Sequence, residues 1–541
     1  MEESASEGVL GFAIERTEHS SGQTRWLRGF KSFSTEGLAR GTLVPTNEHP
    51  LQTFLWGDFT ARNNTKYTYR VVAMRGTPRE LSEGESVSVE VETENEQGDT
   101  HGIYFNRGVA GSQAYSRRFG NRRPSEVPDR EAWRWLSRGL FKAMLDFIAQ
   151  ANGPTYSLRA AVYEFNQGAV LQAFARAKTA GADVSIVYDA RTVIHPTDPE
   201  RSKLQPAESN RTAIEAAGLD DVAIRRTADP RAISHNKFIV LLENGVPKEV
   251  LTGSTNITDG GIFGHSNVVH IVRDPKVAAQ YLQYWEKLAE DPRMDRRDEN
   301  DQIRPFNEEN SPLPTDASSN PGMAPVFSPR KSLEALEWYS GLMESAQSAV
   351  FLTAAFGVND LFEAVMEQPK DYLRYLMLES EDEDMATLNR NPNNRVVVGN
   401  LFSGNNALEN WLREQRLLSE RLSGLNRHVK YIHTKYMLID PLGNNPIVIT
   451  GSANFSDAST RRNDENMLII RDNPRVADVY LGEFMRLFKH FQFRAAASTW
   501  QEGTEDEEAA NLLIPDDSWR LPFYNPARSQ CKERKYFSRA T

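Results

Sequence analysis

The chain has little cysteine, no long apolar run and no excess of basic charge, and each of these shortages argues against a class of protein. Its single cysteine, Cys531, cannot form an intramolecular disulfide, and this favours a reducing compartment. No apolar stretch reaches the ~18 residues that a membrane-spanning helix needs. The N-terminal sequence MEESASEGVLGF is acidic where a signal peptide is basic. We therefore expect a cytoplasmic protein without integral membrane contact.

The formal charge of −11 argues against a protein whose whole surface binds polyanions. A local basic groove remains compatible with this value, because the arginines are not spread evenly. The segment 107–130 is rich in arginine and also contains tyrosine and phenylalanine. Such a cluster is more often a solvated surface than a site, so by itself it identifies no function.

The first 100 residues are predicted to form short β-strands. GFAIER, WLRGFKSF, YTYRVVAMRG and SVSVEVETE alternate or are β-branched, and turn-forming residues separate them. This spacing favours a small β-sandwich. The stretch KYTYRVVAMRG resembles part of a fibronectin type III module, which implies an accessory role.

After about residue 125 the pattern changes to alternating strands and helices, and it does so twice. TYSLRAAVYEF, QGAVLQAFARAKTAG and ADVSIVYDA read as strand, helix and strand, which indicates an α/β fold with helices covering a sheet. A polar, proline-rich stretch separates this set from a second one. We expect six parts: a β-sandwich accessory domain (1–100), an Arg-rich connecting segment (101–130), a first α/β lobe (131–295), a linker or long loop (296–328), a second α/β lobe (329–500) and a C-terminal extension (501–541).

The two α/β halves contain an internal repeat at an offset of 198 residues. HNKFIVLL, which begins at His235, corresponds to HTKYMLID, which begins at His433, and no gap is needed over the next 40 positions. A purely structural duplication predicts shared apolar and turn residues. Here the apolar positions differ, whereas the polar ones are shared, which indicates a functional repeat. The shared pairs are His235/His433, Lys237/Lys435, Gly253/Gly451, Ser254/Ser452 and Asn256/Asn454.

These residues form two sets of H-x-K followed by G-S-x-N, and this pattern resembles the phospholipase D superfamily over residues 130–500. The resemblance implies two similar α/β lobes about a pseudo-twofold, with one active site between them that acts on phosphodiesters without a required metal or cofactor. It assigns catalysis to His235, Lys237, His433 and Lys435. It assigns phosphate binding to both lysines and to the amides and hydroxyls of Asn256, Asn454, Ser254 and Ser452, and structural motif positions to Gly253, Gly451 and Asp440.

The residue types support the same chemistry independently. On a strand, His and Lys at positions i and i+2 point to the same face. Two such strands would surround one phosphate with two imidazoles and two ammonium groups. One imidazole can attack phosphorus and form a phosphohistidine, while the other protonates the leaving oxygen and later activates water or an alcohol. In many members of the family the N-terminal histidine is the nucleophile, which points to His235.

The last residue of the first repeat departs from the motif, because Leu242 stands where the second copy has Asp440. Asp440 is seven residues from His433, so it lies on the opposite strand face and about 20 Å along the strand. We expect it to anchor the turn at PLGNN, while Leu242 fills the corresponding place by packing. Glu243 has the parity to face the site but is too distant. On this reading the first half is active.

Downstream of G-S-x-N the copies differ again. In the family a glutamate at this place often orients the catalytic histidine, and Glu465 fits that role, with Asn267 as its counterpart by offset. If only His433 has a carboxylate partner, the two histidines should differ in basicity. His265 and His270 are expected to be surface or strand residues and not catalysts.

The substrate class stays open between two phosphodiesters. A cytoplasmic nuclease comes first, because segment 107–130 would track a nucleic-acid backbone and stack bases on its aromatic rings. A soluble phospholipase D or phosphatidyl transferase is the alternative. It would need an apolar mouth, which GGIFGHS at 260–266 or the aromatics Trp519, Phe523 and Tyr524 would supply. A phosphate-binding scaffold without turnover is the third possibility, and the basic tail after Cys531 would cover or line the cleft.

Overall fold

The computed structural model of the chain describes most of its 541 residues. The described ranges are 1–34, 36–38, 42–108, 113–120, 122–191, 206–227, 232–294, 300–315, 322–355, 357–380, 385–399, 432–498 and 512–538.

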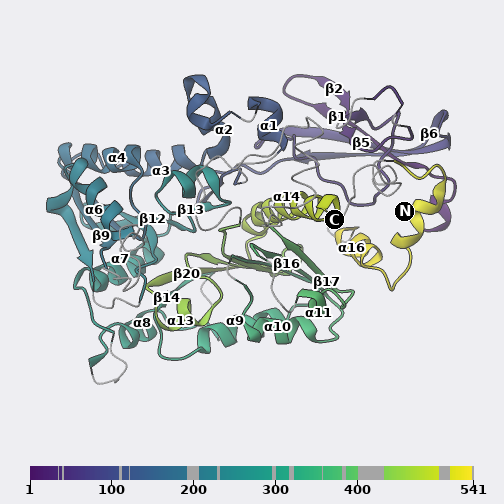
Figure 1. Cartoon of the computed structure of the whole chain (residues 1–541). Coiled ribbons are helices and arrows are strands. Elements are labelled where there is room, and N and C mark those ends of the chain that lie inside the picture. The colour runs from purple at the N-terminus through teal and green to yellow at the C-terminus, as the bar shows by residue number, and fades with distance from the viewer. Residues whose placement is uncertain are drawn as a thin grey trace.

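The N-terminal region is β-rich, as the sequence predicts, and its main element is one antiparallel sheet (Figure 1). The strand order is β2-β1-β5-β6, and a two-stranded ribbon of β3 and β4 accompanies it. Within the described residues the region therefore has one main sheet where a sandwich would have two facing sheets. The strands are β1 (Gly11–Glu18), β2 (Gln23–Trp26), β3 (Arg28–Gly29), β4 (Val44–Pro45), β5 (Lys66–Thr77) and β6 (Glu80–Glu92).

The first lobe is built on a seven-stranded mixed sheet in the order β10-β9-β8-β11-β12-β13-β7. The edge strand β7 lies within 101–130, so the prediction of a plain connecting segment there is wrong. HGIYF alternates over only five residues beside an arginine cluster, which makes the strand hard to recognise. The strands are β7 (His101–Phe105), β8 (Tyr156–Val162), β9 (Asp183–Asp189), β10 (Ala223–Arg226), β11 (Lys237–Glu243), β12 (Val246–Gly253) and β13 (Val268–Val272).

The second lobe repeats this sheet in the order β17-β16-β15-β18-β19-β20-β14. Its edge strand β14 contains Pro325, and an edge is where a strand tolerates proline. Because β14 and helix α8 (Arg304–Asn310) both fall within 296–328, that segment is more than the predicted linker. The strands are β14 (Met323–Ser328), β15 (Ala349–Ala354), β16 (Leu373–Leu378), β17 (Asn394–Val398), β18 (Tyr436–Ile439), β19 (Ile447–Gly451) and β20 (Glu465–Arg471).

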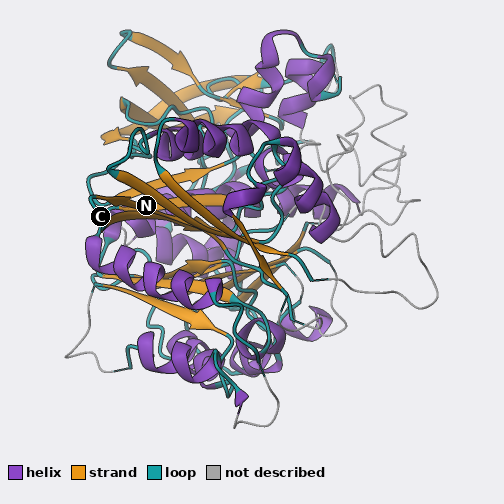
Figure 2. Cartoon of the chain, turned by 90° about the vertical axis from the view of Figure 1, so that its left-hand side faces the viewer, coloured by secondary structure: helices purple, strands orange, loops and turns teal. Residues whose placement is uncertain are grey.

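Two similar lobes thus pack about a pseudo-twofold, as predicted. Helices α7 (Pro275–Ala289) and α14 (Pro474–Ser498) follow the G-S-x-N segments and lie between the two sheets (Figures 1 and 2). The buried side chains of these two helices, which include Tyr281 and Tyr480, form a single core with strand residues of both lobes, such as Phe327. The shared core leaves the lobes little freedom to separate.

Further helices cover the outer face of each sheet. On the first lobe these are α2 (Glu131–Ser137), α3 (Leu140–Ala149), α4 (Gly168–Thr179) and α6 (Pro206–Ala216). On the second lobe they are α9 (Glu334–Glu344), α10 (Asp360–Glu367), α11 (Met385–Leu388) and α13 (Asp457–Arg461). The chain therefore stacks as helices, sheet, central helices, sheet and helices (Figure 2).

The C-terminal extension joins the N-terminal region to the second lobe. The ring of Trp519 packs against Phe12 and Phe54, and its indole N–H donates to the carbonyl of Val9 at 2.8 Å. These aromatics therefore belong to an N-terminal core, and the expectation that they form an apolar mouth is wrong. Helix α16 (Ser529–Ser538) packs on the second lobe, where Glu533 accepts a hydrogen bond from Tyr375.

The aromatic rings of segment 107–130 also pack inside the protein. Tyr115 and Phe119 on α1 (Gln113–Phe119) are each 3% exposed and contact Trp135. They therefore do not stack on nucleic-acid bases as the sequence led us to expect. The Arg107 guanidinium lies over Trp135, 4.5 Å from the ring centroid, whereas Arg118 is exposed.

Among the described residues, none of the helices combines the length and apolar character required to cross a bilayer.

Candidate active site

The two H-x-K motifs lie at the starts of equivalent strands in the two lobes. His235 and Lys237 lead into β11, and His433 and Lys435 lead into β18; all four side chains are buried. Each lysine folds back along its own strand, so that Lys237 Nζ donates to the His235 carbonyl at 2.7 Å and Lys435 Nζ to the His433 carbonyl at 2.6 Å. The alternation of strand side chains thus puts each lysine on the same side as its histidine.

Main-chain contacts between the lobes hold both motifs together. Ser234 forms a parallel bridge with Asp464, and the His235 N–H donates to the Asp464 carbonyl at 2.9 Å. The symmetry-related bridge joins Ser266 to Ile432, and the His433 N–H donates to the Ser266 hydroxyl at 3.2 Å. Each histidine is therefore anchored by a segment of the opposite lobe.

The side-chain partner of each histidine also comes from the opposite lobe. His235 Nδ1 lies 2.8 Å from Glu465 Oε2, and His433 Nδ1 lies 2.9 Å from Asn267 Oδ1. The expectation that Glu465 serves His433 is therefore wrong, since the carboxylate partner belongs to His235. The offset of 198 related Glu465 to Asn267 correctly, but it carries no information about which histidine each one meets. That pairing depends on how the lobes dock.

The serines of both G-S-x-N motifs bind these partner side chains. The Ser452 hydroxyl donates to Glu465 Oε2 at 2.7 Å, and the Ser254 hydroxyl donates to Asn267 Oδ1 at 2.8 Å. Ser459 adds a second hydroxyl to Glu465, at 3.0 Å from Oε1. The sequence assigned Ser254 and Ser452 to phosphate, whereas their hydroxyls are positioned to fix the groups that orient the histidines.

The glycines of the two motifs permit close packing of neighbouring strands. A Cβ on Gly253 would lie 2.3 Å from the Val268 carbonyl oxygen, and one on Gly451 would lie 2.2 Å from the Asn466 carbonyl oxygen. Gly253 also has a φ of +136°, which disfavours any other residue. These close approaches bring Ser254 and Ser452 beside the starts of β13 and β20, where Asn267 and Glu465 lie.

The motif amides are not equivalent in the two lobes. Asn256 Nδ2 donates to Glu164 Oε2 at 2.5 Å, and Asn256 is 5% exposed. Asn454 is half-buried, and its Oδ1, like that of Asn256, accepts no hydrogen bond from the described residues. Glu164 follows Tyr163, whose ring centroid lies 4.9 Å from that of His235 and 5.3 Å from Lys237 Nζ. Sequence reasoning missed Tyr163 and Glu164, because only the pairing of β8 with β11 brings them here.

Burial controls the titration of the site. It lowers the pKa of His235 to about 4, against the raising effect of Glu465, and it lowers the pKa of His433 well below 6.5, an effect that Lys435 reinforces. Burial also lowers the pKa of Lys237 to about 8, with Glu465 and Glu164 opposing the shift. Burial, reinforced by Lys237, lowers the pKa of Lys435 well below its ordinary value, and Glu465 and Glu164 again oppose the shift. An incoming phosphate anion would raise all four values.

Asp440 has a structural role in the second lobe. Its carboxylate accepts hydrogen bonds from the N–H groups of Gln347, Ser348 and Ala349, at 2.9, 2.7 and 3.0 Å, and from the Ser348 hydroxyl at 2.6 Å. It therefore holds the start of β15, while its backbone carbonyl, not its side chain, joins the turn at PLGNN. Leu242 is 5% exposed and belongs to the central core.

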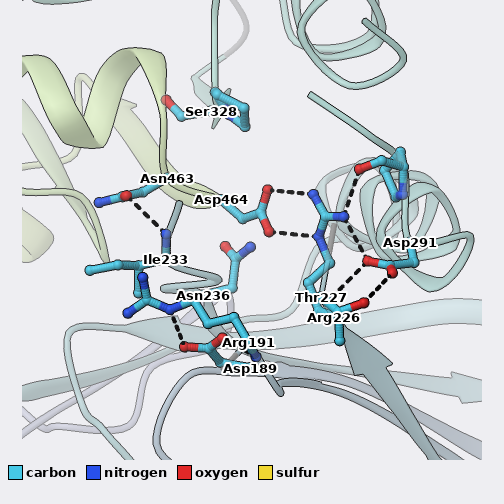
Figure 3. Close-up of polar contacts among 12 residues, drawn as sticks. Asp189, Arg191, Arg226, Thr227, Ile233, Asn236, Asp291, Ser328, Asn463 and Asp464 are labelled. Carbon is cyan, nitrogen blue, oxygen red and sulfur yellow. Dashed lines mark hydrogen bonds and ion pairs between the residues drawn. The ribbon is translucent and has the colours of Figure 1, made fainter. Parts of the chain in front are cut away.

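An ion-pair cluster supports the segment behind His235 (Figure 3). Arg226, at the end of β10, binds both carboxylate oxygens of Asp464 in the opposite lobe, at 2.9 and 3.2 Å. The same guanidinium donates to Asp291 at 2.9 Å. Arg226 and Asp464 are 7% and 4% exposed. Since the Asp464 carbonyl holds the His235 N–H, the cluster links the lobe contact to the position of that histidine.

The two further histidines differ in location. The His265 ring lies 5.4 Å from the His433 ring, measured between centroids, so it borders the site. His270 is fully buried on β13, as the strand prediction requires, and it contacts His101 at 2.9 Å and the Tyr480 hydroxyl at 3.0 Å.

The donor set at this site is two imidazoles, two ammonium groups and amides. The described part of the chain contains no cluster of three or more His, Cys, Asp or Glu side chains suited to a metal ion. The lysines and histidines supply positive charge and transferable protons at one place, which is the requirement for displacement at a phosphodiester.

A family model matches this chain across both lobes. The model described as the cardiolipin synthase, PLD-like domain matches residues 144–289 and 363–488, which contain both histidines. No curated protein sequence matches the chain.

Among solved structures 88 chains match. Polyphosphate kinase from Porphyromonas gingivalis is 10% identical with a TM-score of 0.39, and the match covers 75% of this chain and 53% of the kinase. Phosphatidylserine synthase from Haemophilus influenzae is 11% identical with a TM-score of 0.40, covering 66% and 85%. Nuc from Salmonella typhimurium, a phospholipase D family member, is 18% identical with a TM-score of 0.22, covering 31% and 94%. The chain spans about half the length of the kinase, and these values assign no substrate.

Proposed function

The chain belongs to the phospholipase D superfamily, and we propose that it cleaves or transfers phosphodiesters through a covalent phosphohistidine on His235. The observation that carries the proposal is the crossed pairing at the lobe interface. Each histidine has its Nδ1 bound to a residue of the opposite lobe, which leaves its Nε2 for chemistry beside the lysines.

His235 is suited to be the nucleophile because of its carboxylate partner. With the Nδ1 proton donated to Glu465, the Nε2 lone pair is free to attack phosphorus. Bond formation at Nε2 leaves the ring positively charged, and the adjacent carboxylate stabilises that charge. Burial lowers the pKa of His235 to about 4, so the ring is neutral and able to attack over most of the pH range.

His433 is suited to move the proton. The amide of Asn267 donates from Nδ2 to the Gly261 carbonyl at 2.8 Å, so its Oδ1 faces His433 and only accepts. His433 therefore keeps its Nδ1 proton and uses Nε2 to protonate the leaving oxygen as the P–O bond breaks. In the second step the same Nε2 takes a proton from water or an alcohol, whose oxygen attacks phosphorus while the P–N bond to His235 breaks.

The two ammonium groups stabilise the phosphoryl oxygens during both steps. Lys237 and Lys435 are close enough for each to lower the pKa of a neighbouring cationic group, as Lys237 does for Lys435. A bound phosphodiester relieves this repulsion, and a buried site strengthens the attraction. The positive charge that many phosphodiesterases obtain from metal ions is here supplied by side chains, and we expect activity in the presence of a chelator.

We place nucleic acid first as the substrate, because exposed arginines lie on the first lobe beside α2, a helix that packs on the segment leading to the site. Arg122, Arg123 and Arg130 are exposed around α2. Trp133 of α2 packs on Phe263, 4.7 Å between centroids, in the segment that leads to His265 and the site. Such arginines attract a phosphate backbone in a salt-dependent way. A second candidate is phosphatidyl transfer, which the description of the matching family model favours.

The test offers single-stranded DNA, double-stranded DNA, RNA and phosphatidylglycerol vesicles to the full chain in EDTA. Wild type is compared with His235→Ala and His433→Ala. Nucleic-acid cleavage that depends on both histidines supports the first proposal, and lipid turnover with intact nucleic acid supports the second. Turnover that persists in both variants, or that EDTA abolishes, contradicts the mechanism.

A further inference from the structure

Strand β6 (Glu80–Glu92) forms an exposed outer edge of the N-terminal sheet (Figure 1). It pairs with β5 on one side, and nothing in the described part of the chain pairs with its other side. Three valines at alternate positions point to one face of the strand. They are Val87, Val89 and Val91, which are 66%, 51% and 40% exposed. A row of apolar side chains beside an unpaired edge is the kind of surface on which strands of two molecules pair.

The backbone groups of the free edge belong to the residues between the valines. The Thr93 N–H donates to the Thr65 carbonyl at 3.1 Å, at the end of the ladder between β5 and β6. Bonded and non-bonded pairs alternate in an antiparallel ladder, so the three valines direct their N–H and carbonyl groups to β5. The residues that direct theirs outward, where no described residue binds them, are Ser86, Ser88, Glu90 and Glu92.

The sequence of this edge is complementary to itself. Two β6 strands can pair antiparallel about a twofold axis at Val89. Val89 then meets Val89 of the second copy, and Val87 meets Val91 of the second copy, so that valine faces valine along the whole row. The pairs on the opposite face are Ser88 with Glu90 and Ser86 with Glu92.

The backbone and the charges favour this register over its neighbours. Both members of each serine–glutamate pair are outward residues, so their N–H and carbonyl groups meet and about eight hydrogen bonds form between the copies. Moving one copy by two residues in one direction puts Glu90 opposite Glu90, and like charges directly opposite destabilise a strand pair. Moving it in the other direction puts Glu85 opposite Val91 and leaves fewer valine pairs.

The glutamates of the paired segment, 85–93, are compatible with the approach of a second copy. Glu90 is paired with Lys66 at 2.7 Å, and Glu85 with Arg75 at 3.2 Å, each within its own sheet. These contacts offset negative charge along the edge. Glu92 would lie opposite a serine, whose hydroxyl can donate to the carboxylate.

We propose that β6 is an interaction surface for a second copy of this chain, and that two copies join their N-terminal sheets by antiparallel pairing centred on Val89. The self-complementary register is the reason for choosing a second copy as the partner. Pairing over 86–92 alone is at the low end of known interface sizes, below about 1,200 Å² in total, so the dimer is reversible with a micromolar dissociation constant. The proposal gives the N-terminal sheet an accessory role and is independent of the chemistry at the histidines.

The register determines which single cysteines form a disulfide between copies. Val89→Cys places two thiols in a non-hydrogen-bonded pair with about 4.5 Å between Cα atoms, which is within disulfide reach. Val87→Cys and Val91→Cys are matched controls on the same face, because each lies four residues, about 13 Å along the strand, from its own copy. A mixture of these two controls should cross-link, since Val87 meets Val91. The native Cys531 is buried.

The experiment uses the full chain. Sedimentation equilibrium of wild type from about 1 to 200 µM should show a reversible monomer–dimer equilibrium with no larger species, because a twofold pairing closes. With oxidised glutathione as the oxidant, Val89→Cys and the mixed controls should form covalent dimers at least about 10-fold faster than either control alone. Equal rates for Val89→Cys and the separate controls would overturn the register. Wild type that stays monomeric at about 200 µM would overturn the proposal.

Discussion

Replacing Glu465 by glutamine changes the charge beside His235 and little else. Glu465 Oε2 accepts from His235 Nδ1 and from the Ser452 hydroxyl, and Oε1 accepts from the Ser459 hydroxyl. A glutamine with its oxygen at the Oε2 position keeps the first two bonds. Its amide nitrogen then faces Ser459, whose hydroxyl can accept instead of donate. The ring of His235 should therefore stay in place.

The expected cost follows from the kind of hydrogen bond that is lost. When His235 is bonded to phosphorus its ring is cationic, and a carboxylate partner then makes a charge-assisted bond. Such a bond exceeds a neutral one by about 1–2 kcal/mol, which is about 5- to 30-fold in the rate of phosphohistidine formation. Asn267, a neutral amide on His433, provides the internal comparison. Asn267→Asp should not compensate, because its charge acts on the other histidine.

The assay is a single-turnover reaction with whichever substrate the panel identifies, with formation of protein-bound phosphate followed over time. Glu465→Gln should slow the formation of protein-bound phosphate by about 5- to 30-fold and leave substrate affinity within about 3-fold of wild type. Glu465→Ala should slow it further, because the His235 ring loses its orientation. Equal rates for wild type and Glu465→Gln would refute the assignment of His235 as the nucleophile stabilised by Glu465.

Three further outcomes are expected. Asp440→Ala should lower the free energy of unfolding by about 1–3 kcal/mol, because it removes the carboxylate that accepts from the part-buried N–H groups of Ser348 and Ala349. Thermal unfolding should register this loss, while the activity of the folded fraction stays near wild type. Arg226→Met leaves the Asp464 carboxylate buried and unpaired at the lobe interface, so chemical denaturation should show a free energy of unfolding lower by about 3–5 kcal/mol. A variant as stable as wild type would contradict the role of this ion-pair cluster. The pH profile of kcat/KM should peak below pH 6.5. Neutral His235 is present above about pH 4, and protonated His433 disappears as the pH rises through its lowered pKa. An optimum above pH 8 would exclude these roles.

The sequence was sufficient to predict the two lobes and the motif strands, because each signal is local. Histidine and lysine two positions apart on a strand share a face wherever the strand lies, so the members of each pair are neighbours by necessity. The offset of 198 also related β11 to β18 and α7 to α14 correctly. The seven-stranded sheets then follow from two copies of one supersecondary pattern.

Contacts made by docking could not be predicted in the same way. Glu465 meets His235 and not His433 because the lobes exchange their partner residues across the pseudo-twofold, which is a property of tertiary packing. Tyr163 comes to His235 and Lys237 through strand pairing, with no spacing signal in the chain. The edge strands β7 and β14 were missed because each is short and borders a polar segment, and composition outweighed the brief alternation.

The aromatic residues gave the least reliable signal. Tyr115 and Trp519 suggested binding surfaces from the sequence, but Tyr115 is buried in the core of the first lobe and Trp519 in the small N-terminal core. An aromatic side chain gains so much from burial that its presence near charged residues indicates packing more often than binding.

The covalent intermediate on His235 is the central claim, and trapping it is the most direct test. His433→Ala removes the group that activates water in the second step, so labelled phosphate from a substrate with a good leaving group should accumulate on the protein. Mass spectrometry of peptides kept at alkaline pH should locate it on His235, and the His235→Ala, His433→Ala double variant should carry none. Label on another residue, or full turnover by His235→Ala without any protein-bound phosphate, would contradict the account.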